Sequence, residues 1–156
     1  MTLRLLRAKE DDLDRVLDLQ KIAFQSLLVK YKDYDTNPAN ETLEDLRRRY
    51  HQKGSSYYMI HKDTEVIGAI RLILKDRLMR ISPMFILPSY QGRGLGQAVF
   101  DCLEEDFPQV NHYHLDTILQ EDKLCYLYEK MGFVKNGKAF DIKENMTIVE
   151  YERVRS

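Results

Sequence analysis

Hydrophobic residues recur at intervals of three and four in four stretches of the chain, which is the pattern of helices with one buried face. The first stretch begins at the acidic run 10–12, where carboxylates suit the positive end of a helix dipole. Gly132 follows the last stretch and is well placed to cap it. The four predicted helices cover residues 10–28, about 43–54, 95–107 and about 124–131.

Apolar and aromatic residues also gather in shorter runs, which predict strands at 3–7, 57–61, 66–74, 78–87, 113–119, 133–134 and 146–154. Turns at 62–65 and 75–77 separate three of these runs, so those three strands are expected to be consecutive and antiparallel. Residues 29–41 are expected to form a loop. The order strand, two helices, three strands, helix, strand, helix, two strands predicts an α/β fold with a mixed sheet and helices on its faces.

The composition is that of an ordinary globular protein, and it narrows the range of partners. The chain has 156 residues, of which 44% are hydrophobic and 31% charged, enough for one domain with a core. Its formal net charge is -1, which gives no reason to expect a nucleic-acid partner. We found no long apolar stretch, so we expect neither a signal peptide nor a membrane span. Cys102 and Cys125 lie in helical patterns without redox or metal spacing, which favours reduced thiols and a cytoplasmic location.

Three glycines stand at alternate positions between the fourth strand and the third helix, in ILPSYQGRGLGQAVF. A glycine-rich turn at a helix start lets main-chain N–H groups converge on an anion, and phosphate is the usual occupant. Glycine serves such a turn because it has no Cβ and tolerates positive φ. The dinucleotide motif would need glycine where Gln97 stands, and the P-loop motif has no match. The alternation of Gly92, Gly94 and Gly96 therefore predicts a phosphate loop outside the commonest nucleotide classes.

Two signatures together identify a family resemblance. Residues 91–96 fit the pattern Q/R-x-x-G-x-G/A, so ILPSYQGRGLG resembles the acetyl-coenzyme A loop of the GNAT superfamily of N-acetyltransferases. LYEKMGF, residues 127–133, resembles the second signature of that superfamily, and a predicted strand separates the two. The resemblance extends over residues 78–133. It implies that residues 1–156 form one GNAT-like domain with a mixed, mostly antiparallel central sheet, helices on both faces, and a splayed pair of strands that binds coenzyme A.

The resemblance also implies where coenzyme A lies. Strand 78–87 would carry a bulge and diverge from strand 113–119, with the pantetheine arm pairing to its backbone near Met84, Phe85 and Ile86. The pyrophosphate would rest on main-chain N–H groups of the glycine turn. Many relatives contact pantetheine through an asparagine at the position of Glu121, so Glu121 is included in the predicted binding set with Gln91, Gly92, Arg93, Gly94, Leu95, Gly96 and Gln97.

Direct transfer of an acetyl group from acetyl-CoA to a primary amine is the reaction that the resemblance implies. Tyr128 aligns with the tyrosine that relatives place near the sulfur as general acid. A phenol has a reference pKa of about 10 and is protonated at neutral pH, so it can donate. Tyr128 also shares a helical stripe with Leu124, Leu127 and Met131, which would explain it as a packing residue.

The sequence identifies the general base less clearly than the general acid. Asp116 aligns with a glutamate that some protein-acetylating relatives use as proton acceptor, and it would act directly, through water, or together with His114. Alternation along the strand places His112, His114 and Asp116 on one face, which a polar strand face with satisfied neighbours would equally explain. Their spacing would suit a metal, but no further ligand cluster exists, so no metal is expected.

The acceptor amine stays open among a small amine, a polyamine, an aminoglycoside and a protein amine. The predicted loop offers acidic and aromatic groups that suit a cation: Tyr31, Asp33, Tyr34, Asp35 and Glu41. A homodimer is also open. Two other classes compete with the enzyme: a coenzyme A-binding module of the same fold without catalysis, and a nucleotide-phosphate protein of another fold.

Overall fold

The computed structural model describes residues 2–155 and contains one seven-stranded sheet in the order β1-β2-β3-β4-β5-β7-β6. Only β4 and β5 are parallel, so the sheet is mixed and mostly antiparallel, as predicted. The predicted order of helices and strands is confirmed. The elements are β1 (Leu3–Arg7), α1 (Leu13–Tyr31), α2 (Leu43–Tyr50), β2 (Ser55–Lys62), β3 (Glu65–Lys75), β4 (Leu78–Ile86), α3 (Leu95–Asp106), β5 (His112–Ile118), α4 (Asp122–Lys130), β6 (Val134–Lys143) and β7 (Met146–Val154).

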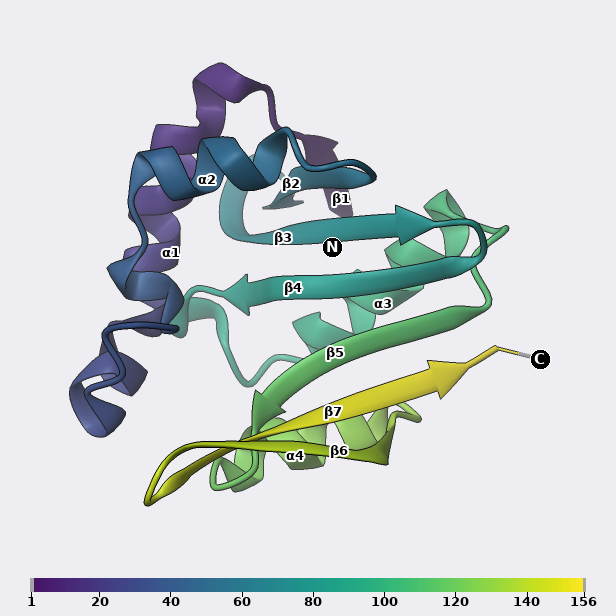
Figure 1. The fold of residues 1–156 in the computed structure, drawn as a ribbon. Coiled ribbons are helices and arrows are strands. Elements are labelled where there is room, and N and C mark those ends of the chain that lie inside the picture. The colour runs from purple at the N-terminus through teal and green to yellow at the C-terminus, as the bar shows by residue number, and fades with distance from the viewer. Residues whose placement is uncertain (1, 156) are drawn as a thin grey trace.

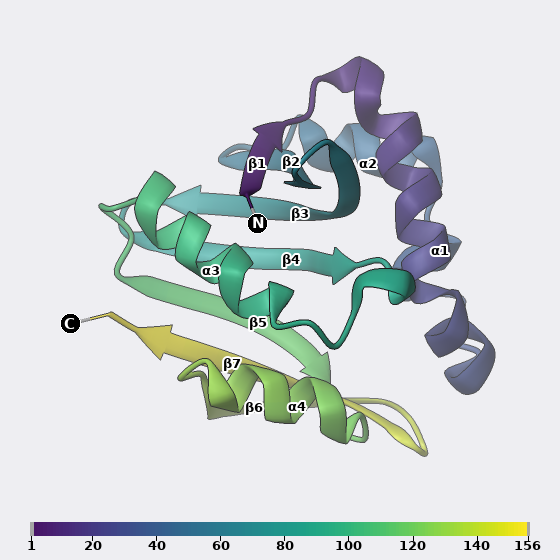
Figure 2. The ribbon, with the colours of Figure 1, turned by 180° about the vertical axis from the view of Figure 1, so that it is seen from behind.

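The helices divide between the two faces of the sheet. Helices α1 and α2 cover one face mainly over the β1–β4 side (Figure 1). On the β5 and β7 side of that face, the C-terminal end of α1 contacts only the end of the sheet, where Tyr31 packs against Ile118 and Met146. Helices α3 and α4 cover the opposite face (Figure 2). The main core lies under α3 and α4, where Phe100 meets the rings of Tyr113 and Phe133 edge to face. A second core under α1 holds the apolar stripe that predicted this helix, including Leu13 and Val16.

Several element boundaries differ from prediction; α2, for example, ends at Tyr50 rather than near residue 54. Two of the differences have a clear physical cause. Helix α1 continues to Tyr31, three residues past the predicted end, because the Tyr31 side chain is buried against Ile118 and Met146. Strand β6 runs over ten residues, whereas only residues 133–134 were predicted. It is an exposed edge strand with almost no buried side chain, so hydrophobic alternation does not mark it.

Strands β4 and β5 pair over only four residues and then diverge. Their pairing runs from Leu78 opposite His112 to Ile81 opposite Leu115, although β4 continues to Ile86 and β5 to Ile118. An extra residue in β4 shifts its register with β3 just past this point. The expected bulge and the splayed strand pair are therefore both present.

Gly68 on β3 is a structural requirement that the sequence analysis did not identify. A Cβ at this position would lie 2.1 Å from the carbonyl oxygen of Phe85 on β4. Only glycine permits this approach of the two strands, at the point where β4 has separated from β5.

Candidate active site

The glycine turn adopts the conformation that its composition predicts. Gly92 and Gly94 have φ values of +78° and +72°, in the left-handed region, and Gly94 directly precedes α3. A Cβ on either residue would meet nothing within 4 Å, so the space above the turn is open. Gly96 lies within the helix, where a Cβ would make an ordinary contact with Leu127 at 3.5 Å. The positive-φ argument thus holds for two of the three glycines.

Main-chain donors of this turn are unused. Within residues 2–155, no hydrogen bond involves the N–H group of any residue from 92 to 97. The first N–H of α3 to find an acceptor is that of Ala98, which donates to the carbonyl of Gly94 at 3.4 Å. Six consecutive free donors at the positive end of a twelve-residue helix are an arrangement that favours an anion.

Most of the predicted side chains around the glycine turn form hydrogen bonds within the turn and α3. The Gln91 amide donates to the carbonyl of Ile86 at 2.8 Å, and the Arg93 guanidinium donates to the carbonyl of Ser89 at 3.3 Å. Gln97 donates to Asp101 at 3.1 Å along α3, and the Leu95 side chain is buried in the core. We therefore expect these residues to offer a ligand their main chain more than their side chains.

The end of β4 presents one free strand edge. Its other edge pairs with β3, where Ala69 lies opposite Phe85. Phe85 packs under α1 against the ring of Phe24 at a centroid distance of 5.6 Å, whereas Met84 and Ile86 pack against the core under α3 and α4. Beyond Ile81 no strand covers the edge toward β5, so this backbone is where a pantetheine arm was predicted to pair.

Tyr128 on α4 has a buried ring and an unused hydroxyl. The ring packs against Phe133 and Tyr151 at centroid distances of 6.1 and 6.3 Å. Its hydroxyl forms no hydrogen bond with any of residues 2–155. Burial, with a smaller contribution from Cys125, raises the pKa of Tyr128 to about 12. The side chain is therefore a protonated donor at neutral pH.

The predicted bases lie on the opposite face of the sheet from Tyr128. His112, His114 and Asp116 share a face, as the alternation predicted, while Tyr113 and Leu115 are buried on the other. Asp116 is the first residue of β5 beyond the last pair with β4 and forms an ion pair with Arg80. Asp116 thus stands where β4 and β5 begin to diverge.

Glu121 connects α1 to the start of α4. Its carboxylate accepts hydrogen bonds from Lys30 Nζ at 2.6 Å and from the Tyr31 hydroxyl. Burial alone would raise the pKa of Glu121, but these two donors outweigh it, and the pKa is below its usual value. Contact of Glu121 with coenzyme A stays a prediction. Lys30 and Tyr31 were not predicted as its partners, because they lie about ninety residues away in sequence.

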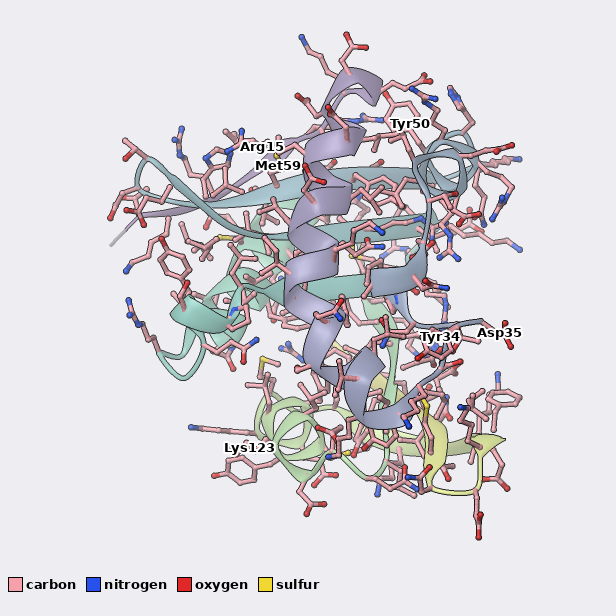
Figure 3. All side chains as sticks on the ribbon, turned by 90° about the vertical axis from the view of Figure 1, so that its left-hand side faces the viewer. Arg15, Tyr34, Asp35, Tyr50, Met59 and Lys123 are labelled. Atoms are coloured by element: carbon pink, nitrogen blue, oxygen red, sulfur yellow. The ribbon has the colours of Figure 1, made fainter. Side chains whose placement is uncertain are left out.

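Most of the acidic and aromatic groups between α1 and α2 already have partners. Asp33 accepts from Thr36, and Glu41 pairs with Arg49 at 3.1 Å. Burial raises the pKa of Glu41 despite this arginine. Tyr34 and Asp35 remain exposed at the outer end of the segment that follows α1 (Figure 3). They line a hollow of about 250 Å³ together with Thr36, Asn37, Asn40, Glu41, Asp45, Arg48 and Arg49.

A family model for the acetyltransferase (GNAT) domain matches residues 29–154. The chain belongs to the GNAT acetyltransferase family. It is an acyltransferase that uses acetyl-CoA. Because the chain belongs to this family, the interpretation as a nucleotide-phosphate protein of another fold is wrong. No curated protein sequence matches the chain significantly.

Solved acetyltransferases share the fold over nearly the whole chain. Spermidine N-acetyltransferase from Vibrio cholerae, in complex with CoA and spermine, has a TM-score of 0.73 at 18% identity, covering 98% of this chain and 95% of that one. AAC(6')-Ib, in complex with ribostamycin and coenzyme A, has a TM-score of 0.73 at 20% identity, covering 99% and 94%. Among residues 2–155 of this acetyltransferase, no helix is long and apolar enough to cross a membrane.

Proposed function

We propose that this acetyltransferase transfers the acetyl group of acetyl-CoA directly to a primary amine of a small cationic molecule. The observation that carries the proposal is the row of free N–H groups from residue 92 to 97, next to the free edge of β4. The amides suit the pyrophosphate of coenzyme A, and the strand edge suits the amide groups of its pantetheine arm. This arrangement would carry the thioester into the gap between β4 and β5.

The chemistry would use both faces of the sheet at that gap. The neutral amine attacks the thioester carbonyl, so a C–N bond forms and the C–S bond breaks. The departing thiolate takes a proton from the Tyr128 hydroxyl, which is protonated and makes no hydrogen bond within residues 2–155. Asp116 takes the proton that the amine loses, directly or through water. Solvent then restores the proton of Tyr128.

A cationic acceptor is supported by the segment between α1 and α2. Tyr34 and Asp35 are the exposed members of its acidic and aromatic set, and Asp35 has no ion-pair partner among residues 2–155. A carboxylate beside an aromatic ring attracts an ammonium group by charge and by cation–π contact. The two solved enzymes described above are in complex with spermine and with ribostamycin, both of which are small-molecule amines.

An acceptor screen tests this proposal. Thiol release from acetyl-CoA is measured over polyamines, aminoglycosides, monoamines and a peptide with a free amine. We expect turnover with a polycationic small molecule and little with the peptide. Tight coenzyme A binding without turnover on any acceptor would instead support the non-catalytic module.

Asp35→Asn gives a sharper test of the acceptor side. It should raise the KM for the cationic acceptor about two- to fivefold, because one exposed charge is lost, and leave the KM for acetyl-CoA unchanged. Asp18→Asn, an exposed carboxylate on α1, is the matched control and should change neither constant. Equal effects of the two substitutions would remove Asp35 from the acceptor site.

A cytoplasmic location is proposed on the state of the thiols. Cys102 and Cys125 form no disulfide, and Cys125 is buried. Unpaired cysteines suit a reducing compartment.

A further inference from the structure

Two histidines and a glutamate gather on the face of the sheet that carries α1 and α2, on the part over β5 and β7 that lies beside these helices. His112 and His114 alternate on β5, and Glu152 lies directly opposite His114 on β7. The two imidazole rings are 4.4 Å apart between centroids. Glu152 Oε2 is 3.0 Å from His112 Nε2 and 3.8 Å from His114 Nε2. One potential ligand atom from each residue lies within 4.8 Å of the others.

A neighbouring carboxylate fixes the orientation of His114. Its Nδ1 lies 3.0 Å from Glu150 Oε1, and Asn136 donates to the same oxygen. A carboxylate oxygen that receives the proton of the Asn136 amide is an acceptor, so a neutral His114 carries its proton on Nδ1 and keeps a lone pair on Nε2.

That Nε2 atom is enclosed and has no hydrogen-bond partner among residues 2–155. His112 Nε2 has a carboxylate partner in Glu152, whereas His114 Nε2 has no hydrogen-bond partner within the described part of the chain. A carboxylate that orients a histidine whose other nitrogen binds a metal is a recurrent arrangement in metal sites.

We propose that His112, His114 and Glu152 bind a divalent transition-metal ion of the Zn²⁺ class, with a fourth position open to water. Zinc binds nitrogen and oxygen ligands at about 2.0–2.2 Å, so tetrahedral ligand atoms lie about 3.3–3.5 Å apart. The separations of 3.0 and 3.8 Å to Glu152 bracket this range, and all three ligand atoms lie within 4.8 Å of one another, so side-chain movements would bring them around the ion.

The surrounding charges favour a cation. Three carboxylates, those of Asp116, Glu150 and Glu152, lie near two cations, Arg80 and Lys138, so the acidic side chains outnumber the lysine and arginine side chains here. The spacing along β5 grouped Asp116 with the two histidines, whereas the carboxylate that lies beside both histidines is that of Glu152. Asp116 pairs with Arg80, and Glu152 comes from a strand that the spacing along β5 does not show.

The metal would join β5 to β7 and lies outside the acetyl-transfer steps proposed above. A metal-bound His114 is not available as a base, so this inference leaves Asp116 as the proton acceptor.

Calorimetric titration of the untagged and chelator-treated chain of residues 1–156 with ZnCl₂ tests the inference. We expect one equivalent of Zn²⁺ to bind and to raise the melting temperature, while Mg²⁺ does neither. His112→Asn and Glu152→Gln should abolish binding, and Glu150→Gln should weaken it about 10- to 100-fold. Co²⁺ should give the visible absorption of a four-coordinate site in the unsubstituted chain, which gives a readout that does not depend on any variant folding.

His51→Ala is the matched control, because His51 Nε2 lies 2.9 Å from Glu10 in an exposed pair and His51 belongs to no group of three potential ligands among residues 2–155. It should leave Zn²⁺ binding unchanged. Absence of Zn²⁺ binding to the unsubstituted chain, or binding that survives His112→Asn, would overturn the proposal.

Discussion

Tyr128 combines a packed ring with a free hydroxyl. The ring contacts Phe133 and Tyr151 in the core, as a packing residue would. The hydroxyl forms no hydrogen bond within residues 2–155, and burial raises the pKa of the phenol to about 12. Packing and proton donation are therefore compatible roles for one side chain, because the first uses the ring and the second the oxygen.

Tyr128→Phe separates these roles, since it keeps the ring and removes the donor. We expect kcat to fall about 100-fold, within the range of general acid catalysis, and the affinity for coenzyme A to change little. Tyr126→Phe, on the same helix but exposed, should leave kcat unchanged. Steady-state kinetics with calorimetry of coenzyme A binding measure both constants. An unchanged kcat across the pH range would remove Tyr128 from the mechanism.

At the scale of elements, the junction between β4 and α3 turns a local sequence pattern into a row of free main-chain donors. Gly92 and Gly94 supply two left-handed residues, and the helix that follows supplies free N–H groups in its first turn. The divergence of β4 from β5 then places a free strand edge in the same part of the fold. Two features generated by different physical causes thus meet at one site.

Gly94→Val tests the turn, and Gly137→Val is its matched control. Both glycines have positive φ and open space for a Cβ, so both substitutions should lower the free energy of unfolding by at least about 1 kcal/mol. Gly137 lies on the edge strand β6, so only Gly94→Val should weaken coenzyme A binding. Urea unfolding and calorimetry measure the two effects. Equal coenzyme A affinity in both variants would contradict the proposed role of the turn.

At the scale of the whole molecule, the sheet separates two chemical environments. The core under α3 and α4 holds Tyr128, and the opposite face of the sheet holds the charged network around Asp116, Glu150 and the β5 histidines. Burial raises the pKa of Tyr57 and of Tyr128 to about 12 each, and it also raises the pKa of Tyr151. Folding therefore depends on these phenols being protonated.

Stability should fall at alkaline pH. Above pH about 10 the unfolded chain loses phenolic protons that the folded chain retains, so the free energy of unfolding decreases until pH passes the folded pKa of about 12. A shift of two pKa units corresponds to about 2–3 kcal/mol for each tyrosine. Urea unfolding across pH should show a flatter alkaline decline in Tyr57→Phe than in the unsubstituted chain. The exposed control Tyr34→Phe should not flatten it.

The sequence by itself determined the order of helices and strands, the position of the glycine turn and the shared face of His112, His114 and Asp116. These follow from periodicity and backbone preference, which act between residues close along the chain. The sequence pattern did not predict the length of β6, because this exposed edge strand has no hydrophobic alternation.

Only the tertiary structure decided which partner each charged group has. Glu121 is held by Lys30 and Tyr31, and Asp116 is held by Arg80. It also brought Glu152 beside the histidines and ended the pairing of β4 and β5 at Ile81. These contacts join residues far apart in the chain. Their formation depends on strand register and helix packing, which no local pattern encodes.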